Sequence, residues 1–223
     1  APNRHCVLLR PSDFSATCRR QTGPRHGALW HLSSLGRAVC RDHEGNPYVV
    51  AFNAQGGQGA RFDQDGVATT VFPANVSSTS IELLEAEAPL LCDRKQLITD
   101  SGGPGRQRGG LGQEVVLRNL AKDDALLSLS GGRFHIAAPG MDGGGQGTLG
   151  IIRLDGGSPE PRRRQALLGQ DGTALFAYPG GGGYGPPYER DPAMVLDDVR
   201  KGYVSRERAE TDYGLVLSND GTA

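Results

Sequence analysis

Short runs of alternating or continuous apolar residues recur along the chain, a pattern typical of β-strands. Glycines and polar residues between the runs indicate turns. Residues 125–130 and 133–137 flank Gly131 and Gly132, and two adjacent glycines favour the positive-φ turn of a β-hairpin. Further strands are predicted at residues 47–53, 67–72, 90–97, 114–120, 148–154, 174–178 and 215–217.

Residues 81–88 have the signals of a short helix. Ser78, Thr79 or Ser80 is suited to cap it, and Pro89 is suited to end it. The amino-terminal part is less clear-cut, because the apolar residues between Gly27 and Gly45 have mixed spacing. That spacing fits either a strand with a turn or a short helix.

Two more short helices are predicted near the carboxy terminus. Asp191 is placed to cap the first, Pro192 suits its first position, and Gly202 ends it. The second runs over residues 205–213 and ends at Gly214. With the strands, these helices predict an α+β fold that is predominantly β, with mixed or antiparallel sheets.

Glycine-rich loops separate the predicted strands. The chain has 34 glycines, about twice the usual share, and they follow no collagen-like period. They concentrate in residues 55–60, 99–114, 139–150 and 179–187. Glycine at this density is expected where one backbone passes close to another, so we expect ordered loops that feed the sheets.

Composition and charge exclude several functions. The formal net charge is −1, which gives no electrostatic reason to expect binding to nucleic acid or to an anionic membrane. No apolar run is long enough to span a bilayer, and no secretory signal is visible. Four cysteines without a C-x-x-C pair favour reduced thiols and a cytoplasmic protein.

The domain organisation follows from the same patterns. Residues 1–25 are rich in arginine and lack a sustained apolar period, so we interpret them as an atypical tail or a truncated joint. Residues 26–217 form the main region, and residues 218–223 are a short tail.

The segment Asp100-Ser101-Gly102-Gly103-Pro104 resembles the nucleophile segment of trypsin-like serine proteases. Such a serine needs a histidine base and an aspartate that orients it. His31 lies in the wrong sequence context for the base, and Asp124 follows the serine instead of preceding it. A structural Asp–Ser turn at the start of a glycine loop is the favoured interpretation.

Residues 145–150 match the dinucleotide-binding pattern G-x-G-x-x-G. A strand-like segment follows them, whereas pyrophosphate binding requires a helix amino terminus there. We interpret the match as chance in a glycine-rich sequence. If ATP is needed for the function of this protein, we expect another chain to bind the ATP.

His26, His31, Cys40 and His43 lie close together in the sequence and offer a possible zinc site. Their spacing fits no familiar zinc module, and scattered histidines with a buried cysteine are the commoner outcome. No metal site is therefore assigned.

Arginines Arg106 and Arg108 stand among the glycines of the loop at residues 99–114. A guanidinium group can hold a carboxylate or phosphate through two hydrogen bonds. The favoured alternative is that both arginines pair with nearby acids and brace the loop. The run Glu189-Arg190-Asp191 is likewise interpreted as a local ion pair before a helix cap.

The glycine loops also identify a family. The run from Asp100 to Gly112 resembles the D-S-G-G-x-G-x-x-R-G-G-L-G segment of the hydantoinase B and 5-oxoprolinase family. Similar segments follow in the family's order at residues 139–141, 179–187, 189–192 and 202–216, and another precedes them at residues 54–61. The resemblance covers most of residues 27–217 and is to the carboxy-terminal part of these subunits.

The resemblance implies an ATP-dependent cyclic amidohydrolase that opens hydantoin or 5-oxoproline. In such enzymes a separate hydantoinase A-like subunit uses ATP to activate the ring carbonyl by phosphorylation, and the B subunit receives the activated compound. Related members are carboxylases of acetone or acetophenone. The candidates for contact with substrate or another subunit are Asp100, Ser101, Gly102, Gly103, Arg106, Arg108 and Tyr184.

The chain departs from the family in length. Complete B subunits are roughly twice as long or more, which exceeds one ordinary domain, and their metal-binding residues lie in the amino-terminal part. ATP and a divalent metal are therefore expected elsewhere in the assembly, with no cofactor bound by this segment and no residue assigned as catalytic. We expect a fragment, a truncated product or a separately encoded half that is inactive alone. A non-catalytic glycine-loop module is the alternative.

Overall fold

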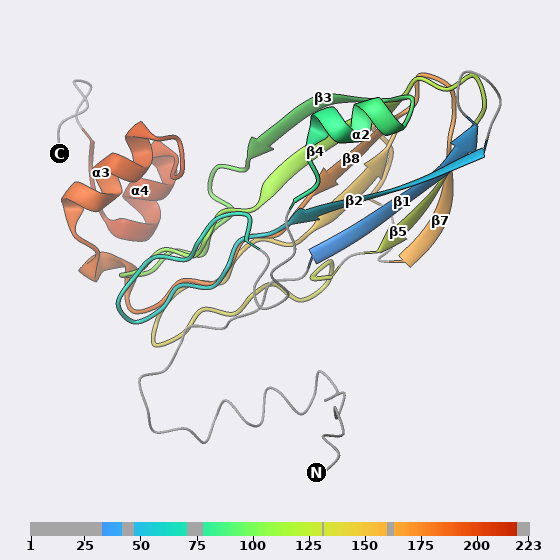
Figure 1. The fold of residues 1–223 in the computed structure, drawn as a ribbon. Helices are drawn as coiled ribbons and strands as arrows, with labels where there is room; N and C mark the ends of the chain where they lie inside the picture. The colour runs from blue at the N-terminus through green and yellow to red at the C-terminus, as the bar shows by residue number, and fades with distance from the viewer. Residues whose placement is uncertain (1–32, 42–46, 71–77, 131, 160–162, 218–223) are drawn as a thin grey trace, which may run out of the picture.

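The computed structural model describes residues 33–41, 47–70, 78–130, 132–159 and 163–217 (Figure 1). They form two antiparallel sheets of four strands each. The first sheet has the order β2-β1-β5-β7 and the second has the order β3-β4-β8-β6. The first sheet contains β1 (Ser33–Arg41), β2 (Pro47–Gln55), β5 (Ala125–Ser130) and β7 (Arg163–Leu168). The second contains β3 (Leu90–Leu97), β4 (Gln113–Asn119), β6 (Ile151–Leu154) and β8 (Thr173–Ala177).

The core lies between the two sheets, as expected for strands that bury every second residue. Along β4, buried and half-buried residues alternate without a break. Phe52 of the first sheet meets Phe176 of the second edge to face, with ring centroids 5.0 Å apart. The core residues include Val50, Phe52, Leu84, Val115, Leu117, Leu127, Ile152, Leu168 and Phe176.

Helix α2 (Ile81–Glu87) begins and ends where the sequence predicts. The Ser80 hydroxyl accepts the Leu83 N–H at 3.4 Å, and the helix ends at Ala88, just before Pro89. Leu84 is buried in the core between the sheets. The helix contacts β2 and β3, which are edge strands of different sheets (Figure 1).

Helices α3 (Pro192–Arg200) and α4 (Arg206–Tyr213), here called the helix pair, lie beside the sandwich (Figure 1). The predicted caps are confirmed: the Asp191 carboxylate accepts the Ala193 N–H at 2.9 Å, and Gly214 ends α4 with φ of 68°. A 3-10 turn, η1 (Pro187–Glu189), precedes α3. The pair has its own apolar cluster of Val195, Val204, Ala209, Tyr213 and Leu217. None of the described helices combines the length and apolarity needed to cross a bilayer.

The predicted hairpin at residues 125–137 is wrong. Its first arm is β5, but residues 132–137 form bends and no strand, and Arg133 has φ of 58°. Strands β1 and β7 occupy both edges of β5, so neither edge is open to the following segment. Local sequence could not show this, because the residues of β7 come more than thirty positions after those of β5.

Two other predicted strands are also wrong within the described residues. Residues 67–70 form a turn in which the Val67 carbonyl accepts the Gln58 N–H at 2.9 Å, and residues 71–72 lie outside the described part. Residues 215–217 pack on the helix pair: the Leu215 N–H bonds to Ala209 O at 3.0 Å, and Leu217 is buried. In both places apolar residues pack against loops or helices instead of a sheet.

Two observed strands were not assigned from the sequence alone. Residues 33–41 form β1, which resolves the choice between strand and helix, and β7 was not predicted. The strand predicted at residues 148–154 begins only at Ile151, because Thr148 donates its N–H to Ser101 O at 3.0 Å. The predicted tails at residues 1–25 and 218–223 lie outside the described residues, as do His26, His31 and His43.

Candidate functional site

Four glycine-rich segments pack against one another beside the end of the sandwich that faces the helix pair (Figure 1). We call them the glycine layer and define it as residues 56–60, 101–112, 139–150 and 179–185. A chain of hydrogen bonds joins three of its segments. The bonds run from Gly103 N–H to Gly181 O, from Gly181 N–H to Gly110 O, and from Gly110 N–H to Gln58 O, at 2.7–2.9 Å. Backbone groups therefore hold the layer together, whereas side chains hold the sandwich.

The layer requires glycine because the backbones of its segments approach one another closely. A Cβ atom placed on Gly180 would lie 1.8 Å from Ser101 O, and one on Gly103 would lie 2.3 Å from Gly145 O. Real Cβ atoms do not come this near to a backbone oxygen, so a side chain at either position would separate two segments. Gly103 thus has a packing role, whatever else the layer does.

The Asp100–Ser101 turn is structural, as the favoured interpretation of the sequence held. Ser101 is completely buried; its hydroxyl donates to Ile98 O at 2.5 Å and accepts the Gly112 N–H at 2.9 Å. Both hydrogen bonds fix the loop to its own ends. A nucleophile must reach substrate, and this hydroxyl is committed to the backbone.

Asp100 connects the layer to the helix pair. Its carboxylate accepts the Ser205 N–H at 2.8 Å, and its own N–H donates to Tyr203 O at 3.0 Å. The neighbouring Thr99 hydroxyl donates to Gly202 O at 2.8 Å. Asp100 has φ of 62°, a conformation that costs a non-glycine residue about 1 kcal/mol or more. These three bonds fix the linker between α3 and α4.

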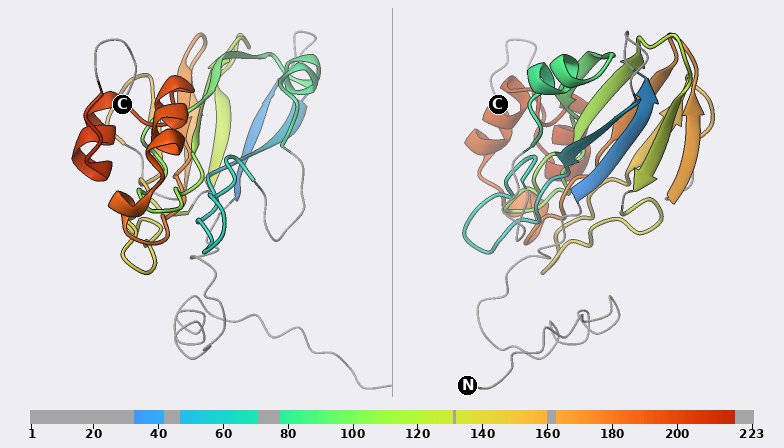
Figure 2. Two further views of the ribbon diagram at one scale, coloured as in Figure 1. Left: turned by 90° about the vertical axis from the view of Figure 1, so that its left-hand side faces the viewer. Right: turned by 45° about the vertical axis from the view of Figure 1, so that its right-hand side comes forward.

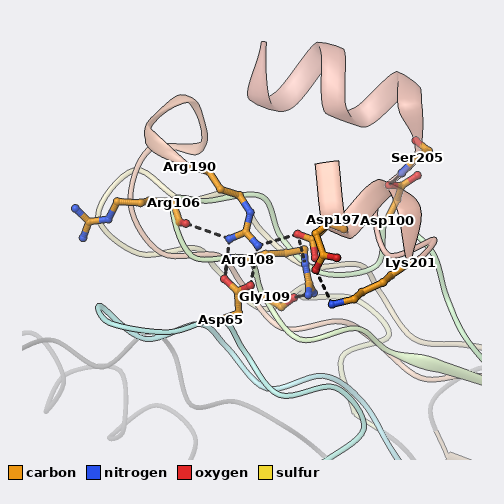
Figure 3. A network of polar contacts seen from close by, with 10 residues as sticks. Asp65, Asp100, Arg106, Arg108, Gly109, Arg190, Asp197, Lys201 and Ser205 are labelled. Atoms are coloured by element: carbon orange, nitrogen blue, oxygen red, sulfur yellow. Dashed lines mark hydrogen bonds and ion pairs between the residues drawn. The ribbon is translucent and has the colours of Figure 1, made fainter. Parts of the chain in front are cut away.

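Arg108 belongs to a buried ion-pair cluster with Asp65, Arg190 and Asp198 (Figure 3). Arg190 binds both oxygens of Asp65 at 2.7 Å and also contacts Asp198 at 2.7 Å, while Arg108 Nε lies 3.1 Å from Asp198. The Arg108 guanidinium also stacks over the ring of Tyr203. The bracing interpretation of Arg108 therefore fits its contacts.

The local ion pair predicted within residues 189–191 is wrong. The side chain of Arg190 is 1% exposed and its partners are Asp65 and Asp198, neither of which is an immediate neighbour in the sequence. Burial lowers the pKa of Arg190, but the hydrogen bond and charge of Asp65, with the charge of Asp198, raise this pKa above its ordinary value. The cluster thus holds a charged guanidinium between the layer and α3.

Arg106 differs from Arg108 in being accessible. Its side chain is 44% exposed and lies 3.8 Å from Glu189, a loose surface contact. In Figure 3 its guanidinium points away from the cluster, and only its carbonyl contacts Arg190, at 3.1 Å. Arg106 is therefore the arginine of this loop that can meet an anion from another molecule.

Tyr184 is buried within the layer. Its hydroxyl donates to the Asp142 carboxylate, and its backbone bridges Gln107 on one side and Met141 on the other. The side chain is 8% exposed, so Tyr184 joins two segments of the layer and presents little surface to a ligand.

A groove of about 630 Å³ opens along the layer, and we call it the loop groove. Asp100 and Gly102 line it, so the structure brings two of the predicted residues together there. Arg108 instead lines a separate cavity of about 350 Å³, with Asp65 and Tyr203. The groove's other lining residues include Pro104, His135, Gln146, Thr148, Leu149 and Arg208.

Sequence reasoning missed His135 and Arg208 as groove residues. They lie on different segments, and nothing in their local sequence marks them, since only the packing of the loops on α4 brings them together. Arg208 pairs with Asp212 at 2.8 Å. The lining of the groove thus combines apolar residues such as Pro104 and Leu149 with titratable groups.

The described residues do not fit the divalent metal expected for the family. Nowhere among them do three or more His, Cys, Asp or Glu side chains gather closely enough to hold an ion. The G-x-G-x-x-G match leads into β6 and not into a helix. No step of a reaction is therefore derived through a metal or nucleotide on these residues.

Comparison with known proteins agrees with the glycine-loop pattern. Residues 16–187 match the sequence profile of the family described as Hydantoinase B/oxoprolinase. The chain is 32% identical over 196 residues to a D-/L-hydantoinase B subunit from Pseudomonas sp. (strain NS671), covering 78% of this chain and 33% of that protein. It is 37% identical over 152 residues to the caprolactamase beta subunit of Pseudomonas jessenii, covering 65% and 26%. The acetone carboxylase alpha subunit of Xanthobacter autotrophicus is 29% identical over 218 residues, covering 78% and 27%.

Solved structures share the fold. The ATP-dependent caprolactamase from Pseudomonas jessenii superposes with a TM-score of 0.74 at 28% identity, over 90% of this chain and 37% of that one. Nucleotide-free acetone carboxylase gives a TM-score of 0.68 at 22% identity, over 94% and 33%, which supports the fold alone. The chain spans 33% of the hydantoinase relative's length and 26% of the caprolactamase relative's. On the profile match over residues 16–187, this chain belongs to the Hydantoinase B/oxoprolinase family.

Proposed function

We propose that this chain is the carboxy-terminal portion of a B-type subunit in an ATP-dependent cyclic amidohydrolase. The substrate class is a lactam-like ring such as hydantoin or 5-oxoproline. The observation that carries the proposal is the match to a hydantoinase B subunit and a caprolactamase beta subunit, both much longer than this chain. ATP would be bound by a hydantoinase A-like subunit, and a divalent metal by the polypeptide that completes the B subunit.

Within that assembly, the role of this chain's residues would be to position the substrate and to form part of the wall that encloses it. The glycine layer supplies a wall with few side chains, along which the loop groove runs. Asp100 and the ion-pair cluster fix the helix pair against this wall. Arg106 is an exposed cation of the glycine layer, and we propose that it meets a carboxylate or phosphate of the substrate or of the adjoining subunit. An amide nitrogen is a poor leaving group, which is why activation with ATP would precede hydrolysis.

The direct test is turnover by the purified chain, with and without its proposed partners. The chain alone, given ATP, Mg²⁺ and hydantoin, 5-oxoproline or caprolactam, is expected to open none of these rings and to release no phosphate. Adding an A-type subunit and the completing B-type polypeptide is expected to give ATP-dependent ring opening. Ring opening by the chain alone, or an inactive complete assembly, would contradict the proposal.

The role of Arg106 can be tested in the same assembly. Arg106→Ala is expected to lower kcat/KM by about 10- to 100-fold, since it removes one charge-assisted contact. Arg153→Ala, on an exposed position of β6, is the matched control and is expected to leave kcat/KM unchanged. Equal kcat/KM values for the two variants would show that Arg106 makes no contact that the reaction needs.

A ketone carboxylase is the second candidate. The identity to the acetone carboxylase alpha subunit extends over 218 residues, and the acetophenone carboxylase delta subunit of Aromatoleum aromaticum is 28% identical over 194 residues. The two functions differ in a co-substrate. Product formation from acetone that requires bicarbonate, with no lactam opened, would favour the carboxylase. Four cysteines without a C-x-x-C pair fit a cytoplasmic location for either enzyme.

A further inference from the structure

The strands of the two sheets differ in charge. The four strands of the first sheet contain no aspartate or glutamate, and their charged residues are all arginines. The second sheet contains Asp93 and Glu114 as well as basic residues. On its outer side Arg94 pairs with Glu114 at 2.6 Å and Arg118 pairs with Asp93 at 2.6 Å. Such exposed pairs are typical of a surface that faces water.

The outer side of the first sheet instead presents an apolar row. Val39 is the backbone partner of both Val49 and Leu126, and Leu126 is the partner of Leu167. Residues directly opposite in antiparallel strands share a face. Val49 is 67% exposed and Leu167 is 62% exposed, although each lies next to a buried neighbour in its strand. By backbone register the row crosses all four strands at the level of Val39, and Leu126 is its half-buried member.

No described helix crosses this side of the sheet, whereas α2 and the helix pair lie elsewhere (Figure 2). The next row on this face is mostly polar or basic by residue type. Arg37 is the register partner of Ala51 and Ser128, and Ser128 is the partner of Gln165. An apolar row of which Val49 and Leu167 are largely exposed, lying beside a polar and basic row, is typical of a surface that another polypeptide covers.

We propose that the outer side of the β2-β1-β5-β7 sheet docks onto the polypeptide that completes the B subunit. This inference rests on the proposed function, because the relatives carry about two thirds or more of their length outside the stretch that matches this chain. We expect a partner surface that is apolar, with carboxylates opposite the row of Arg37.

Coexpression with a complementing polypeptide tests the inference. The tagged chain is produced with the part of the Pseudomonas jessenii caprolactamase beta subunit that lies outside the matching stretch, and copurification and Kd are measured. The double variant Val49→Lys and Leu167→Lys is expected to bind at least 100-fold more weakly. Both positions are exposed in the chain itself, so its melting temperature should not change.

Leu91→Lys is the matched control, since Leu91 is 40% exposed on β3 of the other sheet, and its Kd should equal that of the unaltered chain. Binding by the double variant as tight as by the control would overturn the inference and leave the proposed function standing. Absence of binding by the unaltered chain would contradict the proposed function itself. A homodimer that the double variant dissolves would assign the face to a second copy and also overturn the inference.

Discussion

The sandwich core and the glycine layer are held together by opposite means. In the core, Phe52, Phe176 and their neighbours fill space with side chains. In the layer, Gly180 and Gly103 leave space so that backbones can touch and hydrogen-bond. From this comparison we expect that a region without a hydrophobic core can still be rigid, provided that its backbone donors find acceptors in adjacent segments.

The largest expected effect comes from adding one methyl group to the layer. Gly180→Ala places a Cβ 1.8 Å from Ser101 O, and we expect a loss of about 5 kcal/mol or more in the free energy of unfolding, or no folding at all. Gly169→Ala is the control, because the nearest atom to its added Cβ is 3.8 Å away. It should change stability by less than about 0.5 kcal/mol in a denaturant titration. Equal stability of the two variants would show that the layer is loosely packed.

Removing a side chain from the sandwich should cost somewhat less. Phe176→Ala deletes a buried ring that meets Phe52, and the expected loss is about 3–5 kcal/mol. The same measurement on Leu91→Ala, at a 40% exposed position, should show less than about 1 kcal/mol. A small change in unfolding free energy for Phe176→Ala would show that packing between the sheets is not the main source of the molecule's stability.

The ion-pair cluster should come next. Asp198→Ala leaves Arg108 and Arg190 buried without their shared partner, and the expected loss is about 3 kcal/mol. Its neighbour Asp197 pairs with Lys201 at the surface, with side chains more than half exposed. Asp197→Ala should therefore change the unfolding free energy by less than about 0.5 kcal/mol. If the two variants were equivalent, the cluster would not be what joins the helix pair to the layer.

The smallest expected effect is a pH dependence of the helix pair. Burial raises the pKa of Tyr213 to about 12, so the folded state favours the neutral phenol. That stability is complete below the unfolded pKa of about 10 and is lost as pH rises toward 12, by about 2 kcal/mol for this group. Tyr213→Phe should reduce the slope of unfolding free energy against pH between 10 and 12. An unchanged slope would mean that Tyr213 titrates alike in both states.

Much of the fold could be predicted because its signals are local. Ser80, Asp191 and Gly214 bound helices through hydrogen bonds or backbone angles within a few residues, and most strands have clear apolar runs. Strand β7 was missed because its sequence, Arg-Arg-Gln-Ala-Leu-Leu, begins with polar residues. The hairpin at residues 125–137 failed because strand pairing depends on distant partners.

The site was predictable only in part, for the same reason. The resemblance of residues 100–112 to a known family marks the layer, but not which arginine in it is buried. Arg108 and Arg106 look alike in the sequence, yet one meets Asp198 and the other faces outward. Arg190 was assigned to its neighbours because Asp65, its bidentate partner, lies 125 positions away. Contacts across such distances leave no local pattern.

Native-state hydrogen exchange of glycine amides tests the central claim, that backbone contacts make the layer as firm as the sandwich. The N–H groups of Gly103, Gly110 and Gly181 each bond to another segment of the layer. We predict that their opening free energies lie within about 1 kcal/mol of those in β4, as expected for amides that open only on global unfolding. Rapid exchange at these glycines, with β4 still protected, would contradict the account.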